Sequence, residues 1–125
     1  MGTAQNPSQG SSPSSFTTKG ALPASCRRLL EAMQRLNFGK IENLEIRGGL
    51  PVFEPPPRIV KDVKIGGENS PRPELEMADF RLKAPVIEFF EHLIRLGDGK
   101  IALIEIQYGH PCKLLIEQPS AEVLR

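Results

Sequence analysis

The chain has little cysteine, no long hydrophobic run and almost no net charge. Its two cysteines, Cys26 and Cys112, are too few for the disulfide framework of a small secreted protein, so we expect two reduced thiols in a cytoplasmic protein. No stretch approaches the ~20 apolar residues that span a bilayer, so we expect no membrane association. The net charge of +1 excludes a global field that would attract nucleic acid or anionic lipid.

Residues 1–20 differ in composition from the rest. Sixteen of them are Gly, Pro, Ser, Thr, Asn or Gln, and Phe16 is the only large apolar side chain. Such a stretch buries too little surface to offset the entropy lost on ordering it, and it lacks the basic start and apolar run of a secretory signal. We therefore expect a disordered tail over residues 1–20 and one domain over residues 21–125.

An internal repeat organises this domain. When the chain is shifted by sixty positions, ten of the twenty-three positions from 29 to 51 are identical, far above the one or two that chance would give. The identical pairs are Glu31/Glu91, Arg35/Arg95, Leu36/Leu96, Gly39/Gly99, Lys40/Lys100, Ile41/Ile101, Glu45/Glu105, Ile46/Ile106, Gly49/Gly109 and Pro51/Pro111. Two copies are too few for a solenoid, so they predict one compact domain with internal pseudo-two-fold symmetry.

Each repeat reads as a helix followed by a hairpin. Apolar residues at a spacing of three and four line one helical face in each copy: Cys26, Leu29, Leu30, Met33 and Leu36 in the first, and Val86, Phe89, Phe90, Leu93 and Leu96 in the second. We expect each helix to stop at a glycine, Gly39 or Gly99. Apolar runs broken by Gly-x-Pro then predict two strands per copy. The expected fold class is α+β, an antiparallel sheet with two helices packed on one face.

The repeats, at about residues 23–65 and 83–119, are joined by an extended linker. "EPPPR" (residues 54–58) predicts a stiff, polyproline-like segment, and Ile59, Val63 and Ile65 predict one face of a third strand. Residues 74–83 are ambiguous between strand and helix. Their partial alternation favours an extended segment with a bulge.

Three apolar residues are additional in the second repeat. Ile87, Ile94 and Leu103 replace Arg27, Gln34 and Asn43 of the first repeat, so the second copy is apolar on more than one side. These three residues are the candidate interface, to be covered by the first repeat or by a second chain. Opposite charges on the two halves, +3 over residues 23–65 and −3 over residues 66–125, also suit self-association, although an imbalance of this size arises as readily by chance.

Chemical sites are poorly supported. His110 and Cys112 form one H-x-C pair where zinc sites usually have two close pairs, and a Cys112–His92 nucleophile would need the two to converge. Glu45 and Glu105 would form a carboxylate dyad only if they met at the two-fold axis. Their alternation with apolar residues favours a half-exposed sheet instead. We expect no catalytic, cofactor or metal-binding residues and no enzyme.

A basic surface is the alternative. Six basic residues of the first repeat could contact the phosphates of a nucleic acid: Arg27, Arg28, Arg47, Arg58, Lys61 and Lys64. Five acidic residues lie among the cations of this repeat, and no aromatic residue alternates with them in a stacking pattern. Weak nucleic-acid binding is therefore the second hypothesis.

The first repeat contains a short sequence motif that resembles one in a known protein family. Leu36-Asn37-Phe38-Gly39 followed by "KIENLEI" resembles the helix-ending phrase and hairpin of the YezD-like small bacterial proteins of unknown function. The second copy has Leu96-Gly97-Asp98-Gly99 and matches in its hairpin. The resemblance implies a small cytoplasmic α+β unit, here doubled, and no activity.

The sequence therefore predicts a non-enzymatic binding or assembly module. A fused pair of repeats would do within one chain what a homodimer of the single unit would do. The expected partner is a protein, or a second copy of the chain.

Overall fold

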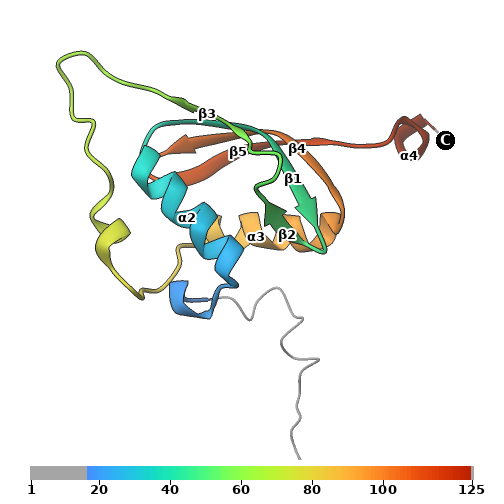
Figure 1. Ribbon diagram of the computed structural model, residues 1–125, viewed down its shortest axis with the longest axis horizontal. Coiled ribbons are helices and arrows are strands. Elements are labelled where there is room, and N and C mark those ends of the chain that lie inside the picture. Colours follow the sequence, from blue (N-terminus) through green and yellow to red (C-terminus); the bar gives the residue numbers. More distant parts are fainter. Residues whose placement is uncertain (1–16, 125) are drawn as a thin grey trace, which may run out of the picture.

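The computed structural model describes residues 17–124 and has an α+β fold, as predicted (Figure 1). Its elements are the short 3-10 turns η3 (Lys19–Ala21) and η4 (Pro73–Glu76), the helices α2 (Ala24–Leu36), α3 (Ala84–Leu96) and α4 (Ser120–Leu124), and the strands β1 (Gly39–Arg47), β2 (Leu50–Val52), β3 (Arg58–Lys61), β4 (Gly99–Gln107) and β5 (His110–Glu117). No helix within residues 17–124 is long and apolar enough to cross a membrane.

The five strands form one antiparallel sheet. Its order is β2-β1-β4-β5, and β3 pairs with the first half of β1 on the side where β2 pairs with the second half. The long helices α2 and α3 lie on one face of this sheet (Figure 1). Both predictions, the antiparallel sheet and the single helical layer, are confirmed.

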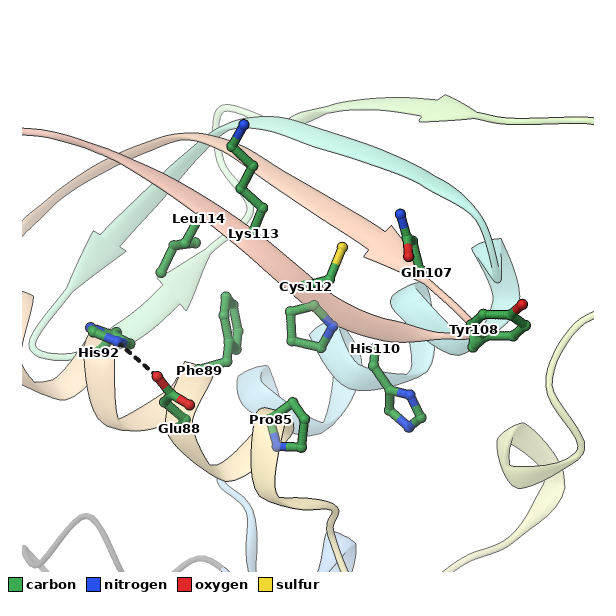
Figure 2. A pocket seen from close by; sticks show the side chains of 11 residues that line it. Pro85, Glu88, Phe89, His92, Gln107, Tyr108, His110, Cys112, Lys113 and Leu114 are labelled. Carbon is green, nitrogen blue, oxygen red and sulfur yellow. Dashed lines mark ion pairs between the residues drawn. The ribbon is translucent and has the colours of Figure 1, made fainter.

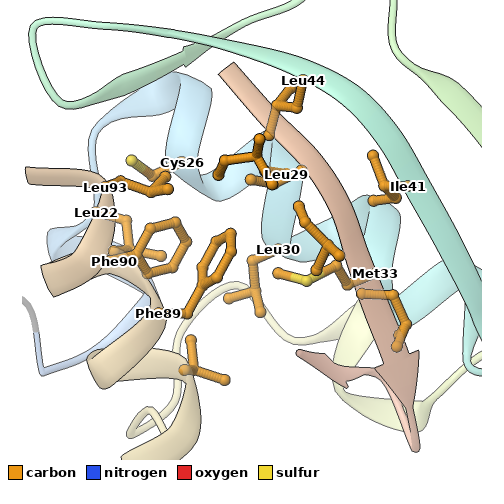
Figure 3. Packing of buried hydrophobic residues seen from close by; sticks show 14 of the residues in the cluster. Leu22, Cys26, Leu29, Leu30, Met33, Ile41, Leu44, Phe89, Phe90 and Leu93 are labelled. Atoms are coloured by element: carbon orange, nitrogen blue, oxygen red, sulfur yellow. The ribbon is translucent and has the colours of Figure 1, made fainter. Parts of the chain in front are cut away.

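The core lies between the sheet and the two helices (Figure 3). It contains Leu29, Leu30 and Met33 of α2, Phe89, Phe90 and Leu93 of α3, and six inward-facing residues of β1 and β4: Ile41, Leu44, Ile46, Ile101, Ile104 and Ile106. The Phe89 and Phe90 rings meet edge to face with their centroids 5.1 Å apart. Each fully buried side chain of this size stabilises the fold by about 1.5–3 kcal/mol.

The two central strands explain several of the repeated residues. In the register of β1 with β4, Lys40 lies opposite Glu105 and Glu45 lies opposite Lys100. Opposite charges in directly facing cross-strand positions are stabilising. Each repeat therefore supplies the lysine that faces the glutamate of the other, and the two glutamates do not meet as a carboxylate dyad.

The predicted helix stops are wrong. α2 ends at Leu36 with Asn37 as its cap, at φ 65°, and α3 ends at Leu96 with Gly97 as its cap, at φ 72°. Gly39 and Gly99 are instead the first residues of β1 and β4. A side chain at residue 39 would place its Cβ 2.2 Å from the Val60 carbonyl oxygen, so the close approach of β3 requires glycine there.

The two helix ends are held by the opposite repeat. The Gly49 amide, in the first hairpin turn, donates to the Gly97 carbonyl at 2.7 Å, and the Gly109 amide, in the second turn, donates to the Asn37 carbonyl at 2.8 Å. Both donors and both acceptors are sixty residues apart. Gly49 lies directly on α3, since a Cβ there would be 3.1 Å from the Ile94 Cα.

The folded region begins earlier than predicted. Residues 1–16 lie outside the described part of the chain, but Thr17–Gly20, which we assigned to the tail, belong to the fold. Lys19 is buried, with its Nζ 3.0 Å from a Glu31 carboxylate oxygen and donating to the Met77 carbonyl at 2.7 Å. A buried ammonium is tolerated here because it is both paired and hydrogen-bonded.

The linker also differs from expectation. The third strand forms, as β3, but it ends at Lys61, and Ile65 beyond it is 97% exposed. Residues 74–83 are not an extended strand: they contain most of η4 and one isolated bridge from Arg81 to Thr18. The Arg72 amide donates to the Gln34 carbonyl at 2.9 Å, so this segment is held by contacts to α2 and to the N-terminal residues.

We predict that Gly49→Ala lowers the free energy of unfolding by about 2–3 kcal/mol, because alanine must adopt a left-handed conformation and also press on the α3 backbone. Gly48→Ala is the matched control: Gly48 also has positive φ, at 58°, but has no atom near its Cβ position, so it should cost only about 1–2 kcal/mol. Urea unfolding of both variants measures the difference. If both variants lose the same free energy of unfolding, the contact of the turn with α3 contributes nothing to stability.

Candidate binding site

The two edges of the sheet are built differently. On one side, the edge is divided into β2 and β3, with three and four residues, and the interruption between them contains Pro55, Pro56 and Pro57. On the other side, β5 is a single strand of eight residues that pairs, within the described residues, with β4 alone. Its pairing with β4 has two register shifts, and its one proline, Pro111, lies near its start, so that Cys112–Glu117 is free of proline. Prolines and short strands protect an edge, whereas an uninterrupted strand leaves a row of amide and carbonyl groups available to another chain.

A groove of about 570 Å³ lies between this open strand and α3. Pro85, Phe89 and His92 of α3 form one wall, and His110 and Leu114 of β5 form the other (Figure 2). Pro111 of β5 also lines the groove. The arrangement follows from the amphipathic pattern of α3, which turns Phe89 to the sheet and leaves Glu88 and His92 at the rim. The groove therefore combines an apolar floor with a polar rim, as binding clefts commonly do.

The polar groups of this groove contact different partners. Figure 2 shows His110 on the α3 side of β5 and Lys113 on the other side. The Cys112 thiol donates to the Glu105 carbonyl at 3.4 Å, and its pKa is raised by burial and by the Glu105 charge, which disfavours the thiolate. His92 lies 3.7 Å from a Glu88 carboxylate oxygen, an i,i+4 helix pair. Burial, followed by the charges of Lys83 and Arg72, lowers the pKa of His110, so it is more readily neutral.

Metal-ligating residues are scattered over the fold. Across residues 17–124, no three His, Cys, Asp or Glu side chains lie close enough together to hold a metal ion.

The first repeat has a corresponding groove, of about 420 Å³, between α2 and the divided edge. Phe53 packs against the core there, and the Arg28 guanidinium lies 4.7 Å from the centre of the Phe53 ring. The segment between β2 and β3 thus lines one side of this groove. Only the groove between α3 and β5, of these two, lies beside a single open strand.

The structure does not gather the three candidate interface residues. Ile87 is half-buried and packs against the core, and half-buried Ile94 lies against the hairpin turn at Gly49. Leu103 lies opposite Leu115 of β5, which is 45% exposed and points away from the core. Leu115 lies on the open edge strand itself and is exposed on the face away from the helices. It was not among the residues singled out from the sequence.

Four of the six candidate basic residues already have partners. Arg27 donates to the Leu22 carbonyl at 2.9 Å, Arg28 stacks on Phe53, Arg47 lies 3.5 Å from Glu45, and Arg58 lies 3.7 Å from Glu42. Lys61 and Lys64 line a different hollow, of about 500 Å³, with Lys40 and Tyr108. Asp62 and Glu105 line the same hollow. The Tyr108 ring meets the Phe38 ring there at a centroid distance of 4.7 Å.

Comparisons of the chain with models of known protein families, with curated proteins and with solved structures gave no match. The resemblance of the first repeat to the YezD-like proteins therefore stays a prediction. The candidate binding site is defined by the geometry of β5 and α3 alone.

The two thiols should react very differently. Cys112 is exposed beside the groove, whereas Cys26 is buried and its burial raises its pKa to about 11. We predict that a disulfide reagent at pH 8 modifies one thiol per native chain and two in denaturant, with the native rate rising from pH 7 to 9 as the Cys112 thiolate fraction grows. Mass spectrometry locates the label. Cys112→Ser should abolish native labelling, and rapid labelling of Cys26 would contradict the packing described here.

Proposed function

We propose that this protein is a non-enzymatic binding or assembly module that accepts an extended segment of another polypeptide alongside β5. The observation that carries the proposal is the single outer strand of eight residues, free of proline from Cys112 to Glu117, next to an apolar groove. An added strand gains main-chain hydrogen bonds from the edge, and its alternate side chains gain pockets that give specificity. The protected opposite edge supports a single binding side, because it directs strand addition to β5.

The internal repeat supports the same proposal. We infer that the second repeat is the partner of the first, related to it by a pseudo-two-fold axis between β1 and β4. Support comes from helices whose bounds are sixty residues apart, from the reciprocal Lys40–Glu105 and Glu45–Lys100 positions, and from the two crossed hydrogen bonds at the hairpin turns. A reducing compartment such as the cytoplasm fits a chain in which both cysteines are free.

The proposal is tested by selecting binders from a displayed random-peptide library against the full chain and mapping their contacts by amide chemical shifts. We expect the shifts to be concentrated in His110–Glu117 and along α3 from Pro85 to His92. Leu114→Ser, which trims a half-buried residue of this edge, should weaken peptide binding by about tenfold or more. Val60→Ser, which trims a half-buried residue of β3, is the matched control and should not. Selected peptides that map away from β5 would overturn the proposal.

Weak nucleic-acid binding is the second candidate, favoured by the cluster of Lys40, Lys61, Lys64 and Tyr108 around one hollow. If three phosphates are contacted there, affinity for a labelled single strand should fall roughly twentyfold between 50 and 200 mM salt. Lys61→Ala with Lys64→Ala should remove most of that binding in an anisotropy titration, whereas Lys83→Ala should leave it unchanged. Binding that does not depend on salt would exclude this candidate.

A further inference from the structure

The outer side of β5 has a self-complementary pattern. Lys113, Leu115 and Glu117 alternate along the face that points away from the helices, while Leu114 and Ile116 between them pack against the core. Leu115 is 45% exposed, and both charged residues are exposed. A cation, an apolar residue and an anion at this spacing are complementary to the same three residues read in the opposite direction.

We propose that the segment accepted alongside β5 is the β5 strand of a second copy of this chain. The two strands pair antiparallel with Leu115 opposite Leu115, so that Lys113 of each copy faces Glu117 of the other. In this register Leu114 of each copy also faces Ile116 of the other on the helical side. The result is an isologous dimer in which one continuous sheet runs through both copies, with α2 and α3 of both on the same face.

The centre of the chain already uses this kind of pairing. β1 and β4 are antiparallel strands in which each lysine faces a glutamate of the other repeat, Lys40 opposite Glu105 and Glu45 opposite Lys100. Facing opposite charges stabilise such a pair, and facing like charges disfavour other registers. A shift of β5 by two residues would place Lys113 opposite Leu115, and neither Lys113 nor Glu117 would face an opposite charge of the other copy. Charge complementarity therefore selects the register centred on Leu115.

The C-terminal segment supports a second copy as the occupant. Beyond Glu117 the chain continues away from the body of the protein to α4, and residues 117–124 are all exposed (Figure 1). In the proposed register Glu117, the last residue of β5, lies opposite Lys113 of the other copy, so the residues beyond it lead toward the His110 end of that copy's β5. This brings α4, with its exposed Val123 and Leu124, next to the end of the partner's groove between α3 and β5. A pairing of the two copies thus gives cover both to the open edge and to these apolar side chains.

This inference rests on the proposed function, because it names the partner of the same edge. It is tested by measuring the mass of the full chain by light scattering and sedimentation over a wide range of concentration. We expect a monomer–dimer equilibrium. Leu115→Glu places two carboxylates against each other at the two-fold axis and should weaken dimerisation by more than about tenfold. Ile59→Glu, at a 53% exposed residue of the opposite edge, is the matched control and should leave the equilibrium unchanged.

Exchanging the charges of Lys113 and Glu117 distinguishes an effect on dimerisation from an effect on the stability of the monomer. Lys113→Glu alone should weaken the dimer, and adding Glu117→Lys should restore it, because each glutamate again faces a lysine of the other copy. Within one chain the double variant places like charges opposite Glu105 and Lys100, so recovery cannot come from a more stable monomer. Hydrogen exchange of the wild-type chain supplies a readout without substitution. Protection of residues 110–117 should rise with concentration, while residues 58–61 stay unchanged.

The outcomes distinguish the two proposals. A monomer at all concentrations overturns the β5 dimer but leaves β5 open to another polypeptide, as the peptide selection would then show. A dimer that survives Leu115→Glu, without added protection of residues 110–117, also overturns the β5 dimer, since the chain would assemble through another surface. Selected peptides that map away from β5 overturn the proposed function as well. A double charge variant that stays monomeric overturns the register.

Discussion

The fold depends on one contact that is made twice, the hydrogen bond from a hairpin-turn glycine of one repeat to the helix end of the other. The Gly49 amide reaches the Gly97 carbonyl at 2.7 Å, and the Gly109 amide reaches the Asn37 carbonyl at 2.8 Å. Each bond satisfies a carbonyl at a helix end that would otherwise lack a partner. Each also fixes a helix against the hairpin of the opposite repeat, so that neither repeat completes its packing alone. One bond ties the end of α3 to the β1–β2 turn, and the other ties the end of α2 to the β4–β5 turn. Together with the shared core, they hold both helices on the same face of the sheet.

A sheet whose centre is formed by β1 and β4 must place one hairpin strand of each repeat at an edge. The first repeat divides its edge strand with Phe53–Pro57, three of whose residues are prolines that cannot donate to a ladder. The second repeat keeps its edge strand whole. The two sequence repeats thus differ at their outer strands, with a divided edge on one side and a single strand on the other.

The general architecture could be predicted from the sequence because it follows from local patterns. Helical spacing of apolar residues located α2 and α3, and the repeat with its Gly-x-Pro turns located the hairpins. The helix stops were misplaced because Gly39 is required by the approach of β3, a contact between distant residues that no local pattern reveals. Lys19 was assigned to the tail for a similar reason: its partners, Glu31 and the Met77 carbonyl, are brought to it only by the folded chain.

The candidate site was less predictable than the fold because its residues have ordinary roles in the sequence. Leu115 reads as one apolar residue in a strand, and only the sheet order shows that this strand is outermost. The repeat nevertheless contains the relevant information. Positions that are identical in both copies, such as Gly49 and Gly109 or Lys40 and Lys100, make the contacts that join the repeats. The edges are where the copies diverge, with Phe53–Pro57 on one side and Lys113–Glu117 on the other. The positions that are identical in the two segments therefore lie where the segments meet, and the positions that differ lie at the two edges of the sheet.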